Sequence, residues 1–415
     1  MLHENLGFYL VNSKSFTNKI QAILFASETN QEISWNYCDD VFNGFNWKIE
    51  PELPIDEYYR LRAKQIRDNY DYVVIRCSGG ADSTNVLYSF LNNNIFPDEV
   101  VGEAPLSGLS NWDFNCKDTR MINTVSEFKF AQIPLLHKIK TNYPNIKVQQ
   151  IDTFNRIIKP KSHDWLINCN DGIDAHASFE GTMYENDYLY KLAEQGKRIA
   201  IVTGTDKPYI SADSEGNVYL TMVDLPLNYL KQPFREAYPN VHRVTFYWTP
   251  DFPQVISKMG HVIAKKLFGK NRDFNLLAAM IAKNSSNIPN SNFNKAEILS
   301  MFSRPVVSDY SIKKNLEYNP NNIYGRGICK YIYPSTFDST VFQAEKMNQN
   351  QTFFGAQQDW IRILHKNLPF IDVINHDFKE IYIKVNPKFL NEYGTGFKYF
   401  HKSYILGQLT DFIGR

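Results

Sequence analysis

A short run of glycines and hydroxyl side chains stands where a predicted strand meets a predicted helix, within "DYVVIRCSGGADSTNVLYSF". Backbone N–H groups at the start of a helix meet a phosphate with aligned donors and a favourable dipole. Glycines let the phosphate approach that backbone closely. The glycines and the additional hydroxyl donors are Ser78, Gly79, Gly80, Ser83 and Thr84. The pattern therefore predicts a phosphate-binding loop.

Asp82 lies within this run, in the first turn of the predicted helix. A carboxylate beside a phosphate is unfavourable by itself, but it can hold Mg²⁺, which bridges phosphate oxygens. The run is not a Walker A loop, because Gly-Lys-Ser/Thr is missing, and it lacks the G-x-G-x-x-G of dinucleotide loops. A bare strand-to-helix turn, with Ser and Asp as caps, is the structural alternative. The residues favour a loop for a Mg-bound pyrophosphate group.

The stretch "SGGADST" resembles the signature of the PP-loop, or N-type ATP pyrophosphatase, superfamily. Members include the synthetase domains of asparagine, GMP, NAD and argininosuccinate synthesis and enzymes that thiolate tRNA, and PAPS reductases share the fold. The resemblance covers residues 72–248 and implies that Ser78, Gly79, Gly80, Asp82, Ser83 and Thr84 bind the pyrophosphate end of ATP. It also implies that ATP is split to AMP and PPi through an adenylated substrate, with Asp82 as a catalytic residue. The whole chain is similar to bacteriophage PP-loop proteins labelled PAPS reductase-like or asparagine synthase-like.

A second loop, in "IAIVTGTDKP", ends the fourth predicted strand of the sheet. In a doubly wound sheet of order 3-2-1-4-5, strands one and four are neighbours at the switch point, where ligands bind. We therefore expect Gly204, Thr205 and Asp206 to face the glycine run, and Gly-Thr-Asp resembles the corresponding loop of NAD synthetases. Asp206 is a candidate second Mg²⁺ ligand, and Lys207 a candidate catalytic residue that neutralises charge on PPi. A β-turn formed by Asp206 and Pro208 is the alternative.

Two further site residues follow from the resemblance. Family analogy places adenine on backbone groups at the end of the second strand, near Gly102 and Glu103. In asparagine-synthetase-type sites a downstream lysine helps to neutralise pyrophosphate, and Lys258 in "DFPQVISKMGH" is the candidate here, with Asp251 of the same stretch as the other residue considered. A solvated helix face is the alternative for Lys258.

The five cysteines include no C-x-x-C pair, which argues against a disulfide framework and a cysteine zinc site. A thiol near the loop can carry sulfur, and Cys77 and Cys329 are the candidates for that alternative. The polar stretch "SHDWLINCNDGIDAH" is a further candidate for binding Mg²⁺ or an acceptor, against the simpler interpretation of a polar loop.

Strands and helices alternate along the middle of the chain, which indicates βαβ units and a parallel sheet. We predict strands over 72–77, 98–104, 146–152, 198–206 and 242–248, and helices over 83–94, 119–143 and 184–196. The fold class is α/β, with a doubly wound five-stranded parallel sheet of order 3-2-1-4-5, and the resemblance implies the adenine nucleotide alpha hydrolase-like type. A hairpin turning at Glu215-Gly216 is expected between strands four and five.

The chain divides into three predicted parts. These are a small N-terminal α+β element at 1–55, the PP-loop domain at 56–248 and a mainly helical substrate or lid region at 249–415. In the last part, Thr249 is a predicted N-cap with Pro250 in the first helical position. The stretches "EIYIKVNPKFL" and "FKYFHKSYILG" near the end have strand-like character.

The 415 residues are 43% apolar with a net charge of +1, so no global field attracts nucleic acid or a membrane. No apolar run is long enough to span a bilayer, and we expect a cytoplasmic protein.

We expect an ATP- and Mg²⁺-dependent ligase or transferase that adenylates an acceptor oxygen for attack by a nitrogen or sulfur nucleophile. The acceptor is a small molecule or a nucleobase, and a separate protein that donates ammonia or sulfur is a candidate partner. Two short segments mixing basic and aromatic residues leave nucleic acid open as another partner, and modification of a nucleotide or nucleic-acid base as a niche. The alternatives are a PAPS reductase-like or sulfur-transfer enzyme, which needs a working cysteine, and a nucleotide-binding sensor without turnover.

Overall fold

The computed structural model describes residues 7–104, 131–152, 187–204, 207–213, 215–224, 239–270, 329–336, 383–390 and 400–413. The strands in these ranges are β1 (Phe8–Val11), β2 (Lys14–Phe16), β3 (Ile33–Asn36), β4 (Tyr72–Arg76), β5 (Glu99–Ala104), β6 (Lys147–Asp152), β7 (Ile199–Thr203), β8 (Tyr209–Ala212), β9 (Asn217–Val223), β10 (Val241–Thr245) and β11 (His401–Gln408). The helices are α1 (Lys19–Thr29), α2 (Asp39–Phe42), α3 (Ile55–Asn69), α4 (Ala81–Leu91), α7 (Ile133–Asn142), α11 (Asp187–Glu194), α13 (Gln254–Phe268), η3 (Pro387–Phe389) and α21 (Leu409–Ile413).

Five strands form a parallel sheet in the order β6-β5-β4-β7-β10, which confirms the predicted order 3-2-1-4-5. β4 lies in the middle, where Val74 aligns with Glu99 of β5 on one side and with Ile201 of β7 on the other. This doubly wound α/β sheet is consistent with a Rossmann-like nucleotide-binding fold. The switch point lies between β4 and β7.

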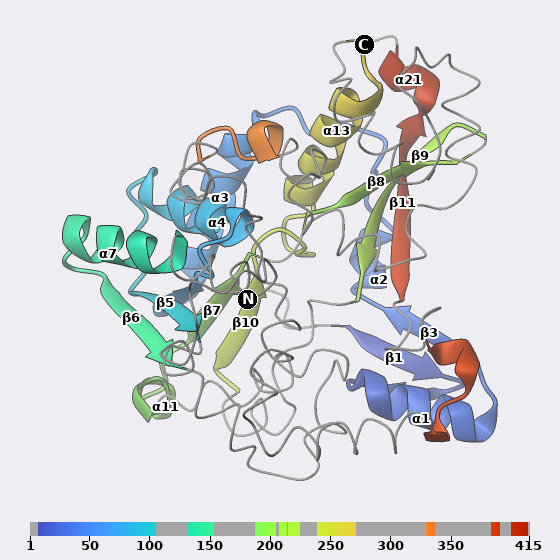
Figure 1. The fold of residues 1–415 in the computed structure, drawn as a ribbon, viewed down its shortest axis with the longest axis horizontal. Coiled ribbons are helices and arrows are strands. Elements are labelled where there is room, and N and C mark those ends of the chain that lie inside the picture. Colours follow the sequence, from blue (N-terminus) through green and yellow to red (C-terminus); the bar gives the residue numbers. More distant parts are fainter. Residues whose placement is uncertain are drawn as a thin grey trace, which may run out of the picture.

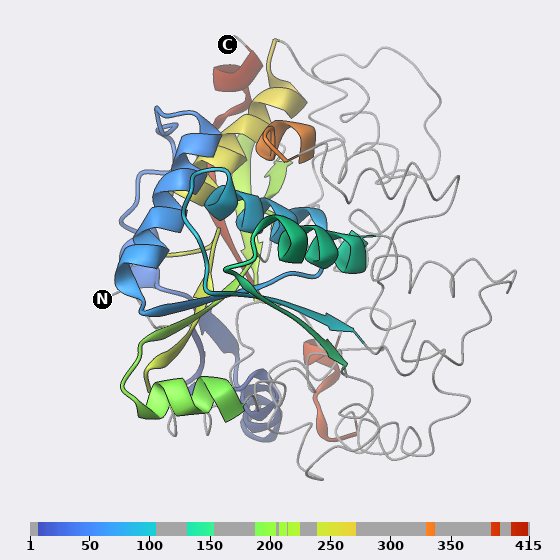
Figure 2. The same cartoon turned by 90° about the vertical axis from the view of Figure 1, so that its left-hand side faces the viewer.

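Helices cover both faces of the parallel sheet (Figures 1 and 2). Figure 2 shows α3, α4 and α7 on one face and α11 on the other. Alternate residues of β4 lie on opposite faces of the sheet. Val73 and Ile75 belong to the large core, and Val74 belongs to the smaller cluster with Leu189 of α11. Burial on both faces explains why the central strands β4 and β7 read as nearly continuous apolar runs rich in β-branched residues.

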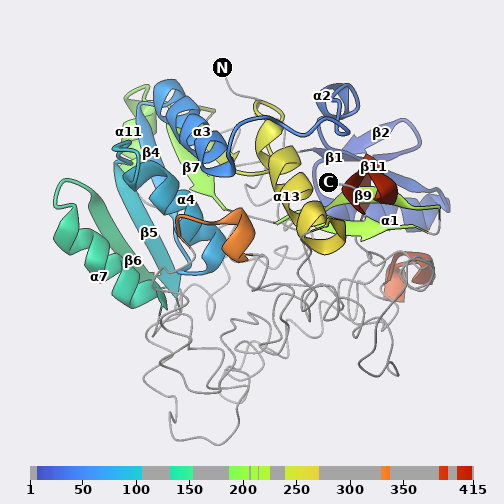
Figure 3. The ribbon, with the colours of Figure 1, turned by 90° about the horizontal axis from the view of Figure 1, so that it is seen from above.

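A separate antiparallel sheet has the order β11-β9-β8 and lies beside α13 (Figure 3). The predicted hairpin is confirmed, because β8 pairs with β9 and the Gly216 N–H donates to the Asp213 carbonyl at 3.1 Å in the turn. β11 comes from the chain's end and pairs with β9 over Val223↔His401 to Asn217↔Gln408. The strand character predicted for "FKYFHKSYILG" is therefore confirmed for His401 onward.

Near the N-terminus, β1 pairs with both β2 and β3 in a three-stranded antiparallel sheet, with α1 packed nearby (Figure 1). Asn18 caps α1, and its side chain accepts a hydrogen bond from the Gln21 N–H at 3.0 Å. A buried ion pair links this unit to the end of β9, because Lys19 Nζ lies 2.9 Å from Asp224 Oδ2.

The helix predicted to begin at Pro250 begins later. α13 starts at Gln254, after Pro253, because a proline disfavours helical backbone in the residue before it. Thr249 caps the preceding turn instead, where its Oγ1 accepts a hydrogen bond from the Asp251 N–H at 3.3 Å.

The strand-like character predicted for "EIYIKVNPKFL" is wrong for its described part. Residues 383–390 form a helical turn and then η3, with Pro387 at its start. Pro387 fits the first position of a helical turn, where an N–H is not needed, better than the inside of a strand.

Buried residues from all three predicted parts of the chain belong to one hydrophobic cluster, for example Tyr37, Ile75 and Met259. The three-part division itself stays a prediction. None of the described helices combines the length and apolar character that a bilayer span requires.

Candidate functional site

The glycine run forms a tight loop between β4 and α4. Gly79 has a φ of +83°, a conformation that side chains rarely adopt. A Cβ on Gly79 would lie 2.5 Å from the Gln132 backbone nitrogen, so the residue before α7 lies directly against the loop. Glycine is therefore required at position 79 both by the backbone conformation and by close packing.

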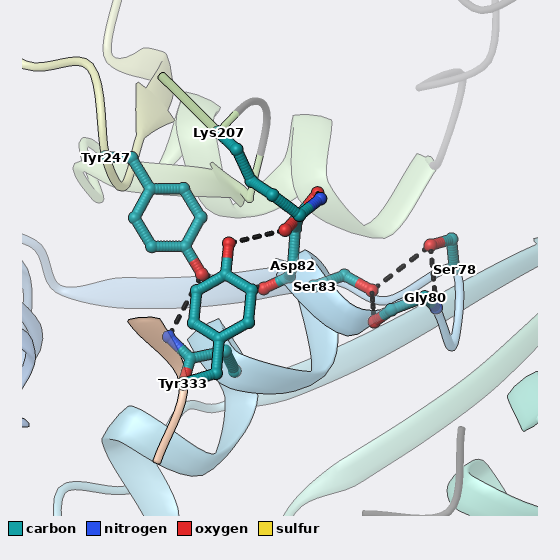
Figure 4. Close-up of polar contacts among 8 residues, drawn as sticks. Ser78, Gly80, Asp82, Ser83, Lys207, Tyr247 and Tyr333 are labelled. Atoms are coloured by element: carbon teal, nitrogen blue, oxygen red, sulfur yellow. Dashed lines mark hydrogen bonds and ion pairs between the residues drawn. The ribbon is translucent and has the colours of Figure 1, made fainter. Parts of the chain in front are cut away.

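Hydroxyl groups hold the loop in shape (Figure 4). Ser78 Oγ accepts from the Gly80 N–H at 3.2 Å and lies 3.1 Å from Ser83 Oγ. Ser83 Oγ donates to the Gly80 carbonyl at 3.2 Å, and buried Thr84 donates to the Gly79 carbonyl at 3.3 Å. Ser83 and Thr84 thus shape the loop from within, while Ser78 is exposed at its surface.

The N-terminus of α4 follows this loop, and among the described residues no side chain caps it. Gly80 is the N-cap residue, half-buried and without a side chain of its own. The first N–H groups of a helix lack partners within the helix and carry partial positive charge. The arrangement suits an anion.

Two donors meet at Asp82 in the first turn of α4 (Figure 4). Lys207 Nζ lies 2.7 Å from Asp82 Oδ2, and the Tyr333 hydroxyl donates to Oδ1. The side chains of Lys207 and Asp82 are 16% and 24% exposed, so the pair lies at the edge of the buried core. The structure therefore brings together Asp82 and Lys207, two residues that the sequence analysis assigned to one site.

The β7 loop lies against the same turn. A Cβ on Gly204 would lie 2.8 Å from Val86 Cγ2 and 2.9 Å from the Asp82 carbonyl oxygen. Gly204 and the glycine run thus meet at the switch point, as expected. Thr205 and Asp206 lie outside the described residues, so the second predicted metal ligand stays a prediction.

A chain of hydrogen bonds extends inward from Asp82. The Tyr247 hydroxyl donates to the Asp82 carbonyl at 3.0 Å and accepts from Asn85 Nδ2 at 3.0 Å. Asn85 Oδ1 in turn accepts from Thr336 Oγ1 at 2.9 Å. Residues 329–336, named here the 329–336 segment, are in this way joined to α4.

The tyrosines beside Asp82 remain protonated donors. Burial raises the pKa of the Tyr333 hydroxyl well above its ordinary value, and the negative charge of Asp82 adds to the shift. Burial and the same charge also raise the pKa of Tyr247. A hydroxyl that keeps its proton can donate to a carboxylate but cannot act as a base near neutral pH.

Gly102 has a packing role in the structure. A Cβ there would lie 2.5 Å from Leu136 Cδ1, so α7 sits directly on β5. The Gly102 carbonyl accepts from Gln150 Nε2 at 3.2 Å. Gln132 Nε2 bridges the Cys77 and Glu103 carbonyls at 3.1 and 3.2 Å and so ties the glycine run to the end of β5. The adenine contact expected near Gly102 stays a prediction.

Lys258 is not brought to Asp82 in this structure. Its Nζ lies 2.8 Å from Glu50 Oε1 and donates to the Pro51 carbonyl at 2.9 Å, so it fastens α13 to the N-terminal part. Lys265, about two helical turns further along, also pairs with Glu50. These contacts account for Lys258 without a role at the loop.

The cysteines considered for sulfur chemistry are buried. Cys77 and Cys329 are 1% and 3% exposed, and Cys77 faces the core beneath α4. The polar stretch around residues 162–176 lies outside the described residues.

The donors present fit a nucleotide pyrophosphate. An uncapped helix start, close-packed glycines and Lys207 together offer positive potential to an anion. Mg²⁺ takes one or two carboxylates and fills its remaining positions with water and phosphate oxygens, so Asp82 alone suits it. Among the described residues, no cluster of three or more His, Cys, Asp or Glu side chains could hold a metal without such a partner.

Sequence reasoning missed Tyr333, Tyr247 and Gln132, which surround the loop from distant parts of the chain. Only Tyr247 offered a signal, because it lies near the end of the predicted fifth strand, 242–248, and so belongs near the carboxyl edge of the sheet. The site is thus a loop and helix start at the switch point of a five-stranded parallel α/β sheet. Comparison of the chain with protein-family models, curated proteins and solved structures found no match.

Proposed function

We propose that the protein is an ATP-dependent enzyme that transfers AMP to an acceptor oxygen and releases PPi. The observation that carries the proposal is the Lys207–Asp82 pair, 2.7 Å apart across the switch point and beside the uncapped start of α4. The resemblance of "SGGADST" to the PP-loop signature agrees with this chemistry.

In the proposed reaction, the acceptor oxygen attacks the α-phosphorus of ATP. The bond from that phosphorus to the oxygen bridging the α- and β-phosphates breaks, and its electron pair leaves with PPi. A nitrogen or sulfur nucleophile then attacks the activated acceptor carbon, and AMP leaves with the acceptor oxygen.

The N–H groups at the start of α4 hold the β- and γ-phosphates in this proposal, and Lys207 neutralises charge that develops on PPi. Asp82 is the residue that would hold Mg²⁺, which supplies further charge neutralisation on the phosphates when bound. Positioning and electrostatic stabilisation supply most of the rate enhancement. The acceptor is a small molecule or a nucleobase.

PPi release tests the proposal. The wild type, Asp82→Ala and a control variant, Asp68→Ala, are incubated with ATP and Mg²⁺ and with pools of carboxylates, nucleotides, tRNA or DNA. Asp68 is a good control because it is an exposed carboxylate on α3 that pairs only with Lys64 at 2.8 Å in the described structure. We expect release that depends on one pool and on Asp82 but not on Asp68.

Two other outcomes are informative. ATP binding without PPi release in any pool would favour a nucleotide sensor. Failure of the wild type to bind ATP would overturn the proposal.

A further inference from the structure

The two oxygens of the Asp82 carboxylate have different kinds of donor. Oδ2 faces the ammonium of Lys207, at the end of a long and flexible side chain. Oδ1 accepts from the hydroxyl of Tyr333, which is 1% exposed. The first donor carries a charge that a phosphate also attracts, whereas the second is neutral.

The Tyr333 side chain is held on several sides. Its ring packs against those of Tyr59 and Tyr247, with centroid distances of 6.3 and 5.9 Å, and these two rings also contact each other at 6.0 Å. The 329–336 segment is fastened to α3 and α4, because Tyr59 donates to the Ile332 carbonyl at 2.6 Å and Thr336 donates to Asn85 at 2.9 Å. Tyr333 therefore has little freedom to follow a moving carboxylate.

When an anion binds at the start of α4, its charge competes with Asp82 for the Lys207 ammonium. The neutral Tyr333 hydroxyl that donates to Oδ1 takes no part in this competition. Each carboxylate oxygen also has a further lone pair that can bind a cation. The Tyr333 bond can thus persist while the Lys207 contact changes.

We propose that Tyr333 is a positioning residue of the ATP site: it fixes the Asp82 carboxylate so that the oxygen released by Lys207 faces the metal–phosphate group. The inference rests on the proposed function, and it makes the 329–336 segment part of the nucleotide site. Tyr333 acts through Asp82 and does not itself touch ATP.

The test uses Tyr333→Phe in the full-length protein, with Tyr88→Phe as the matched control. Tyr88 belongs to α4 itself, and its hydroxyl is buried without a hydrogen-bond partner among the described residues. Both variants lose one tyrosine hydroxyl, but only one of them loses a bond to Asp82. ATP affinity is measured by calorimetry with Mg²⁺ and again with EDTA, and melting temperatures are recorded alongside.

We expect Tyr333→Phe to weaken ATP binding about tenfold with Mg²⁺, the size of a lost hydrogen bond to a charged group. Affinity in EDTA should stay unchanged, and Tyr88→Phe should match the wild type in both. A merely structural role would lower the two affinities together. A second variant, Tyr59→Phe, loosens the 329–336 segment without contacting Asp82 and should show a smaller loss with the same metal dependence.

The inference fails, and the proposed function stands, if the wild type binds ATP in a Mg²⁺-dependent way and Tyr333→Phe binds it equally well. It also fails if the loss is the same in Mg²⁺ and EDTA. Failure of the wild type to bind ATP would overturn both.

Discussion

Replacing Gly79 by alanine should destabilise the protein more than the same change at Gly196. The two glycines have nearly the same φ, +83° and +80°, both in the range that side chains rarely adopt. They differ in their surroundings: a Cβ on Gly196 meets nothing within 4 Å, whereas one on Gly79 would lie 2.5 and 2.7 Å from backbone atoms of Gln132. Comparing the two alanine variants therefore separates the free-energy cost of the backbone conformation from the cost of the packing clash.

The magnitudes follow from these two terms. Left-handed backbone costs an alanine about 1–2 kcal/mol, and the stiffer unfolded chain offsets about 0.4–1 kcal/mol of that. Gly196→Ala should then lower the free energy of unfolding by about 1 kcal/mol. Gly79→Ala adds overpacking of about 1–3 kcal/mol, because backbone at the start of α7 cannot rotate away as a side chain would.

Urea unfolding followed by tryptophan fluorescence measures both losses. We expect a difference between the variants of about 1–3 kcal/mol, together with weaker ATP binding in Gly79→Ala alone. Equal losses of stability would refute the reasoning, because they would show that the residue before α7 does not press on the loop.

Two further predictions concern the Glu50 ion pairs that fasten α13 and the cysteines considered for sulfur chemistry. Burial alone would raise the pKa of Glu50, but hydrogen bonds and charges from Lys258 and Lys265 outweigh it and lower the pKa below 4.5. Since the folded state favours the ionised form, Glu50→Gln should cost about 1–3 kcal/mol at pH 7 and progressively less as the pH falls through the lowered pKa; a loss that is independent of pH in urea unfolding would contradict this. Cys77→Ser and Cys329→Ser should leave ATP-dependent PPi release intact, since both thiols are buried, and abolished release in either variant would favour sulfur transfer.

The parallel sheet could be predicted because its signals are local. Runs such as "YVVIR" in β4 and "IAIVT" in β7 are buried on both faces and rich in β-branched residues. Right-handed crossovers then leave few topologies for alternating strands and helices. The glycine run was found for the same reason, because a strand, a loop and a helix start follow one another without interruption.

The rest of the site depends on contacts between distant residues. Tyr333 meets Asp82 across 251 positions of sequence, and Lys258 meets Glu50 across 208. No periodicity or turn signal encodes such pairs, so a lysine on a helix face could not be assigned to one partner rather than another. The start of α13 was predicted wrongly for a local reason. Pro250 and Pro253 both fit the start of a helix, and the helix begins directly after Pro253.

The position of β11 has a consequence for the order in which the protein assembles during synthesis. β9 ends at Val223, but the strand that pairs with its outer side begins only at His401. At about 5–20 residues per second, the ribosome needs on the order of ten to forty seconds to make the intervening chain. Throughout that interval β8 is the one described strand available to pair with β9, and unpaired strand edges favour association between chains. β11 therefore completes, among the described residues, a sheet whose first two strands are synthesised much earlier, so a chain halted between residues 223 and 401 would leave that edge of β9 without the partner it has in the folded protein.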